Sequence, residues 1–119
     1  MNAEEYQKVI DEQKAIIVAA QTQIEKAKRE FVESAPIKIG DIVELVGPKG
    51  EVSDEKAKVV SLGVYAGSKS TQVSIGKVRR YSDKKGDYTK KPEWAWNGVR
   101  KDGITYPWWD SEILTENSL

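Results

Sequence analysis

Residues 3–33 read AEEYQKVIDEQKAIIVAAQTQIEKAKREFVE, and this stretch predicts one long amphipathic helix. It contains neither Gly nor Pro and is rich in residues with high helix propensity. A heptad repeat over this length is typical of a helix that packs along another helix. The helix is expected to end near residues 34–35, because Pro36 disfavours helical geometry in the residue before it. The side chains that recur every seven residues are Ile10, Ile17, Ile24 and Phe31.

The apolar face of this helix is wider than that row. If the row occupies heptad position a, Val9 and Ile16 widen the face at position g. About thirty helical residues span roughly 45 Å, whereas a strand of a small barrel covers only about 17–20 Å. A barrel packed beside the helix would therefore shield about half of the face. The d positions are held by Tyr6, Gln13, Ala20 and Ala27.

The unshielded half predicts an interface. Full burial of one Ile or Phe side chain is worth about 1.5–3 kcal/mol, and a large exposed apolar patch favours aggregation. We therefore expect self-association into a homo-oligomer or docking of a partner protein. The small d residues permit a close antiparallel approach but do not fix the order of the oligomer. The alternative is that the helix kinks or folds back over its own barrel. The predicted face comprises Tyr6, Ile10, Ile17, Ile24 and Phe31.

After Pro36 the apolar period changes to two, which is typical of half-buried strands. Asp102-Gly103 is the strongest hairpin signal in the chain, and Gly76 is a candidate for a bulge. These features predict an α+β chain: a coiled-coil-like amphipathic helix in residues 1–35, then a five-stranded antiparallel, partly open barrel in residues 36–119. A short turn or strand at residues 111–114 is expected to close it. The five expected strands are 42–46, 56–64, 71–81, 93–101 and 104–109.

Two segments resemble the beginning and the end of SH3-like small barrels of the KOW or Tudor type. Residues 38–46 read KIGDIVELV, and a Gly-rich turn and a strand with Val59 and Val60 follow them. Residues 108–114 read WWDSEIL, which is similar to the aromatic-then-Glu-Ile/Leu ending of many such barrels. The resemblance covers residues 36–115. It implies an SH3-like barrel that binds proteins, nucleic acids or modified peptides.

The composition restricts the chemistry. The 119 residues include no His and no Cys, so an imidazole base, a Ser-His or Cys-His nucleophile and a Cys/His metal site are all excluded. We expect no enzymatic activity, no cofactor and no metal. The acidic N-terminus is unlike a secretory signal, and the longest apolar run, residues 15–20, is far too short to cross a bilayer. A cytoplasmic location without membrane contact is therefore expected.

Residues 69–101 are rich in cations and aromatics, although the whole chain has 19 basic and 19 acidic residues. Cations that neutralise phosphates, interleaved with aromatics that stack on bases, are what single-stranded nucleic acid requires. The alternative is a solvated hairpin whose lysines keep an exposed sheet edge from pairing. The possible ligand surface comprises Arg79, Arg80, Lys84, Lys85, Tyr88, Lys90, Lys91, Trp94 and Trp96.

The four tryptophans are too many for the interior of one small barrel. The surplus is expected to form a surface aromatic cluster, either a stacking platform or the seat of the helix. The sequence therefore predicts a non-catalytic binding and assembly module that acts through protein–protein contacts and self-association. Its alternative is a module that binds nucleic acid through residues 69–101. An acid–base enzyme that uses only carboxylates and tyrosines is a third hypothesis.

Overall fold

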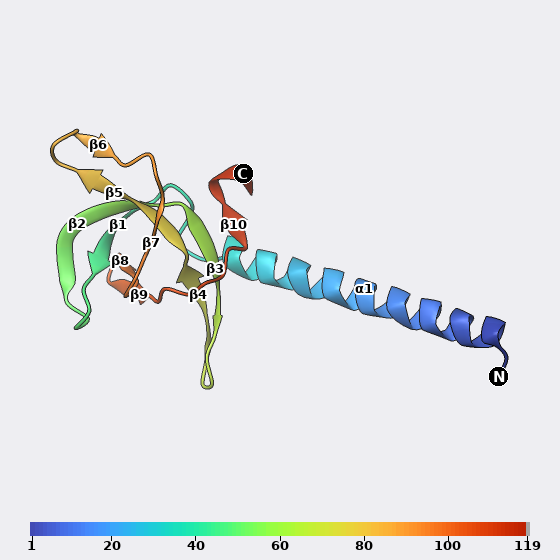
Figure 1. Ribbon diagram of the computed structural model, residues 1–119. Coiled ribbons are helices and arrows are strands. Elements are labelled where there is room, and N and C mark those ends of the chain that lie inside the picture. Colours follow the sequence, from blue (N-terminus) through green and yellow to red (C-terminus); the bar gives the residue numbers. More distant parts are fainter. Residues whose placement is uncertain (119) are drawn as a thin grey trace.

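The computed structural model describes residues 1–118, so Leu119, the last residue of the predicted barrel segment, lies outside the described residues. One helix, α1 (Ala3–Glu33), leads into a β-rich domain (Figure 1). Asn2 caps its start, because the Asn2 side chain accepts a hydrogen bond from the backbone N–H of Glu5 at 2.8 Å. The helix ends at Glu33, which confirms the stop predicted from Pro36.

The domain contains two antiparallel sheets. The larger has the order β6-β5-β2-β1-β8-β9, with β7 also paired to β5, and the smaller has the order β10-β3-β4. A 3-10 turn, η1 (Glu116–Ser118), follows the last strand. The strands are β1 (Ile42–Val46), β2 (Val52–Val59), β3 (Ser61–Ala66), β4 (Thr71–Ile75), β5 (Lys77–Ser82), β6 (Asp87–Tyr88), β7 (Glu93–Trp94), β8 (Val99–Lys101), β9 (Ile104–Tyr106) and β10 (Leu114–Thr115).

The prediction of five strands closed into a partly open barrel is wrong in its count, and the two sheets do not close into a barrel. One reason is that residues 95–98 divide the predicted strand 93–101 into β7 and β8, and that β6 and β10 lie outside the five predicted segments. The other reason is that single residues interrupt two of the predicted strands. Val60 separates β2 from β3 and Gly76 separates β4 from β5, so each long segment contributes to both sheets. A Cβ at Gly76 would lie 2.4 Å from the hydroxyl oxygen of Ser61, so a larger residue would have to displace this hydroxyl.

Other local predictions are confirmed. β1 matches the expected first strand, and a short strand follows the last hairpin as expected, but β10 pairs with β3 in the smaller sheet and closes no barrel. Asp102 and Gly103, with φ of 51° and 81°, form the turn of the β8–β9 hairpin, as a primed two-residue turn requires.

The hydrophobic core lies between the two sheets and reaches the last turn of α1. Val32 is fully buried there, and Ile37, in the connection to β1, is also fully buried. The core therefore fixes the end of the helix to the domain. Its other buried members are Ala35, Val43, Leu45, Ala57, Val59, Leu62, Val73, Ile75, Val78, Ala95, Val99, Tyr106 and Leu114.

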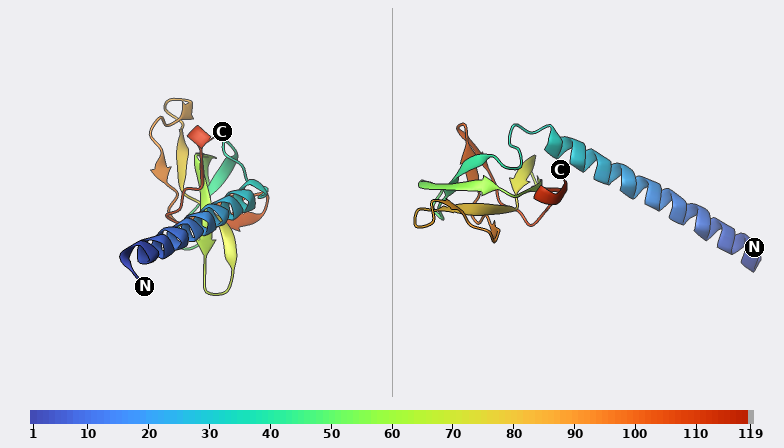
Figure 2. Two further views of the ribbon diagram at one scale, coloured as in Figure 1. Left: turned by 90° about the vertical axis from the view of Figure 1, so that its right-hand side faces the viewer. Right: turned by 90° about the horizontal axis from the view of Figure 1, so that it is seen from above.

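The rest of α1 projects away from the domain, and Figure 2 shows this from two further directions. The molecule measures 70 × 32 × 23 Å along its principal axes. Of the 31 residues of α1, all of them described, only Val32 is buried. The expectation that the domain shields half of the apolar face is therefore wrong, and the helix neither kinks nor folds back. The helix is therefore anchored to the domain only in its last turns, where Val32 is buried.

Candidate interaction surfaces

The first candidate is the apolar stripe of α1, defined as Tyr6, Ile10, Ile17, Ile24 and Phe31. Ile17 and Ile24 have exposed fractions of 55% and 54%, in the middle of the helix. Tyr6 is exposed, Ile10 is half-buried, and Phe31 remains 40% exposed although it lies beside the domain. The stripe is thus open along its full length.

The domain contacts the other side of the helix. Val32 enters the core, and the guanidinium of Arg29 donates a hydrogen bond to the backbone carbonyl of Ser118 at 3.4 Å. A shallow pocket of about 330 Å³ lies between Glu25, Lys26 and Arg29 of the helix and Glu112 and Ile113 of the domain. At about 100° per residue, these helical positions lie roughly 100–200° around the axis from the row that ends at Phe31. The apolar stripe therefore faces away from the domain.

Arg79, predicted to face a ligand, is paired within the domain instead. Its Nη2 and Nε lie 2.8 and 3.0 Å from the two carboxylate oxygens of Glu116, and its Nη1 donates to the carbonyls of Thr89 and Lys90. The hydrogen bond from Arg79 lowers the pKa of Glu116 and raises the pKa of Arg79. The ion pair holds η1 and the loop after β6 against β5.

The remaining predicted cations fall into separate groups. Arg80 forms ion pairs with Glu93 at 3.2 Å and with Glu55 at 3.7 Å. Lys84 and Lys85 are exposed in the turn between β5 and β6, at the opposite end of β5 from its pairing with β7. Lys90 and Lys91 are exposed in the loop before β7. The predicted surface is therefore not one continuous basic face.

Tyr88 is half-buried and belongs to a small aromatic pair. Its ring lies 5.3 Å from that of Tyr81, and the ammonium of Lys58 lies 4.6 Å from the Tyr88 ring centroid. This pair joins β5 to β6 across their hairpin, and the cation–π contact from Lys58 stabilises it.

The tryptophan cluster, defined as Trp94, Trp96, Trp108 and Trp109, is the second candidate surface. Trp96 and Trp108 have ring centroids 4.3 Å apart, and Trp94 lies 5.9 Å from Trp108. Trp96 and Trp109 are 55% and 46% exposed, which confirms the expected surface cluster. The indole N–H of Trp108 is buried and has no hydrogen-bond partner among residues 1–118. The Trp108 side chain therefore contacts the neighbouring indoles through its ring.

Two pockets meet at Trp96 and Arg80. One, of about 430 Å³, has three cationic side chains in its lining, Lys77, Arg80 and Lys91. The other, of about 470 Å³, carries Glu51 and Glu55 beside the turn after β1. The ammonium of Lys77 lies 4.8 Å from the Trp94 ring centroid, so a cation already occupies one face of this indole. The exposed indole that lines both pockets is that of Trp96.

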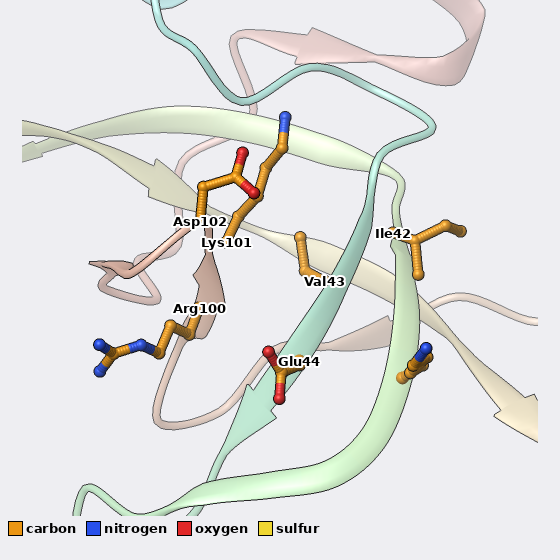
Figure 3. A pocket seen from close by; sticks show the side chains of 7 residues that line it. Ile42, Val43, Glu44, Arg100, Lys101 and Asp102 are labelled. Atoms are coloured by element: carbon orange, nitrogen blue, oxygen red, sulfur yellow. The ribbon is translucent and has the colours of Figure 1, made fainter.

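A further pocket of about 360 Å³ crosses β2, β1 and β8 (Figure 3) and was not predicted from the sequence. On the two flanking strands, Lys56 and Arg100 stand opposite Glu44. Opposite charges on neighbouring strands support a sheet, and Figure 3 shows the Arg100 side chain pointing away from Glu44. Charges of both signs line this pocket, so it favours neither an anionic nor a cationic ligand. Only the register of β1 with β2 and β8 brings these residues together, and the sequence alone does not give that register.

A half-buried ion pair adjoins this pocket. The ammonium of Lys101 lies 2.5 Å from the carboxylate of Asp41. Burial raises the pKa of Asp41, but the hydrogen bonds from Lys101 and from the backbone N–H of Lys38 outweigh it and lower that pKa overall. The bond to Asp41 raises the pKa of Lys101. The pair ties β8 to the connection between α1 and β1.

Within residues 1–118 no helix is long and apolar enough to cross a membrane. The same residues contain no group of three or more side chains placed to hold a metal ion. The chain matches no protein-family model, no curated protein and no solved structure.

Proposed function

We propose that this protein is a non-catalytic binding and assembly module, and that α1 associates with other chains through its apolar stripe. The observation that carries the proposal is that Ile17 and Ile24 are more than half exposed on a side of the helix that the domain does not contact. Lack of His and Cys supports a role in binding rather than catalysis. An SH3-like origin of the β domain, expected from residues 36–115, is part of this proposal.

The energetics favour association. Fully burying an Ile or Phe side chain stabilises a protein by about 1.5–3 kcal/mol. An isolated helix also has marginal stability in water, and most helical stability comes from packing of its apolar face. A helix of about 46 Å with one buried residue therefore gains both burial and helical order from a partner that covers the stripe.

The test compares two double variants by sedimentation velocity. Ile17→Asp with Ile24→Asp places two carboxylates in the stripe, and the expected result is a monomer. Ala15→Asp with Thr22→Asp places the same charges on the opposite side of the same helical turns, so the wild-type mass should be retained. Circular dichroism checks that the domain remains folded. An unchanged oligomer in the first variant, or a monomeric wild type, would contradict the proposal.

A second candidate function is binding of single-stranded nucleic acid. The observation that favours it is the 55% exposed Trp96 beside a pocket lined by Lys77, Arg80 and Lys91, with Glu93 in the same lining paired to Arg80. Base stacking on an aromatic side chain is worth about 1–3 kcal/mol. Arg79 is not part of this pocket, and its guanidinium is paired with Glu116.

This candidate is tested by fluorescence anisotropy of a labelled single-stranded oligonucleotide at low and physiological salt. Affinity should fall with salt, and both Trp96→Ala and the charge reversal Lys91→Glu, at a lysine that lines the pocket beside Trp96, should weaken it. Lys49→Glu, in the turn after β1, is the charge-matched control for a single lysine. Binding that does not change with salt, or no binding at low salt, would reject nucleic acid as the partner.

A further inference from the structure

We infer that the partner of the stripe is a second copy of this chain, and that the two α1 helices pair antiparallel with residues i and 37 − i at the same level. This inference rests on the proposed function, because it specifies the partner and geometry of the same surface. Three features of α1 support it: the sizes of the side chains along the stripe, its length, and the distribution of charge.

The side-chain sizes are complementary in this register. Antiparallel helices bring position a of one chain opposite position d of the other. Ile10 then meets Ala27 of the second copy, and Ile17 meets Ala20. A large side chain opposite a small one lets the two backbones approach closely without leaving a void. The remaining layers are Ile24 with Gln13, and Phe31 with Tyr6.

Other arrangements fit less well. In a parallel pair the d layers are Ala20 with Ala20 and Ala27 with Ala27, which leave space between layers of paired Ile. An antiparallel pair shifted by one heptad leaves either Tyr6 or Phe31 without a partner layer. The register in which positions sum to 37 pairs every residue of the stripe, and it is centred on the helix Ala3–Glu33.

Charge opposes the parallel arrangement. Residues 4–14 contain Glu4, Glu5, Asp11 and Glu12 against Lys8 and Lys14, a net charge of −2, whereas residues 25–33 have three acids and three bases. A parallel pair sets two acidic halves side by side, and an antiparallel pair sets each acidic half beside a neutral one. The helix dipoles also oppose each other favourably in the antiparallel pair. Residues 15–24, at the crossing, carry no charge.

The domain leaves room for the second helix. Phe31 is 40% exposed at the end of α1, although the next residue, Val32, is fully buried in the core. The domain therefore does not cover the last layer, where Tyr6 of the second copy belongs. In this pair the two domains lie at opposite ends of the paired helices, because each domain is attached to its own helix only at the C-terminal end.

Disulfide trapping tests this geometry without background, because the chain contains no cysteine. In the full chain, Ile10→Cys with Ala27→Cys should form a covalent dimer on mild oxidation, with Cys at 10 linked to Cys at 27 in tryptic peptide mass spectra. The two sites are about 25 Å apart along one helix, so this link cannot form within a chain. The single variants Ile10→Cys and Ala27→Cys should remain unlinked.

The matched control is Ala15→Cys with Thr22→Cys, two positions that also sum to 37 but lie on the outer side of the helix, and it should stay unlinked. Disulfides in either single variant of the stripe would establish parallel pairing and overturn the inference. A dimer by sedimentation in which the double variant does not link 10 to 27 would also overturn it. A monomeric wild-type chain would instead show that the proposed function itself fails.

Discussion

Phe31 and Val32 are neighbours in the chain, but they face opposite environments: Val32 is fully buried in the core, whereas Phe31 is 40% exposed on the apolar stripe. In an α-helix successive residues are about 100° apart, so the same turn both anchors α1 to the domain and continues the stripe. Anchoring and association are therefore separate properties of α1, and single substitutions can separate them.

Val32→Ala should destabilise the domain, because it removes two methyl groups from a filled site where α1 enters the core. The expected loss in the free energy of unfolding is about 2 kcal/mol. Urea denaturation followed by tryptophan fluorescence measures it. Val18→Ala, the same change at a site 60% exposed, is the control and should alter stability by less than about 0.5 kcal/mol. Equal losses in both variants would show that Val32 does not anchor the helix.

The ion pair of Arg79 and Glu116 should make stability depend on pH. The hydrogen bond from Arg79 lowers the pKa of folded Glu116 below its ordinary value of 4.5, so the unfolded chain binds the proton more readily. The pair's contribution is fully present above pH 4.5 and is lost as the pH falls through the lowered, folded pKa. Since both groups are partly exposed, we expect about 1 kcal/mol at pH 7.

The measurement is the free energy of unfolding of wild type and Glu116→Gln from pH 7 to pH 3. The difference between the two proteins should be largest at pH 7 and shrink on acidification. Asp54→Asn, at an exposed position of β2, removes one carboxylate elsewhere and should not reproduce this trend. A constant difference at all pH values would mean that the contribution does not come from the charge of Glu116.

Gly98→Ala should destabilise the protein strongly. Gly98 has φ of 92°, and a Cβ there would lie 2.3 Å from the backbone carbonyl oxygen of Tyr106 in β9. The substitution therefore adds a steric clash to backbone strain of about 1–3 kcal/mol. Gly50→Ala provides the comparison, because Gly50 has φ of 83° but a Cβ there would meet no atom within 4 Å. Urea denaturation should show a larger loss for Gly98→Ala, and equal losses would remove the role of the contact.

Tryptophan fluorescence reports directly on the tryptophan cluster. Trp96 is 55% exposed whereas Trp94 is half-buried beneath Lys77. Trp96→Phe should therefore remove more of the acrylamide-accessible emission than Trp94→Phe does. If the order is reversed, Trp96 is not the more exposed of these two indoles.

Local patterns in the sequence were sufficient to predict the helix, its end, the first strand and the Asp102-Gly103 hairpin, because each depends on a few consecutive residues. The bend at Val60 lies where two consecutive valines, Val59 and Val60, shift the apolar alternation by one residue, and the predicted strand 56–64 ran through this shift. The pairing of Arg79 with Glu116 joins residues 37 positions apart, so the charge run alone suggested that Arg79 was free for a ligand. The side of α1 that contacts the domain is marked by the buried Val32. Val32 is not at an a or d position, so the heptad pattern could not identify this side.

The attachment of α1 by its last turns has a consequence for amide hydrogen exchange. Amides in residues 3–24 are protected only by the helix itself, whereas those in β1, β2 and β5 are protected by the whole domain core. The N-terminal amides of a free chain should then exchange through local fraying, orders of magnitude faster than those of the core strands. If a partner covers the stripe, exchange of the amides in residues 3–24 should slow, while exchange in β1, β2 and β5 should not change. A single exchange experiment on the intact chain therefore distinguishes a free helix from a covered one.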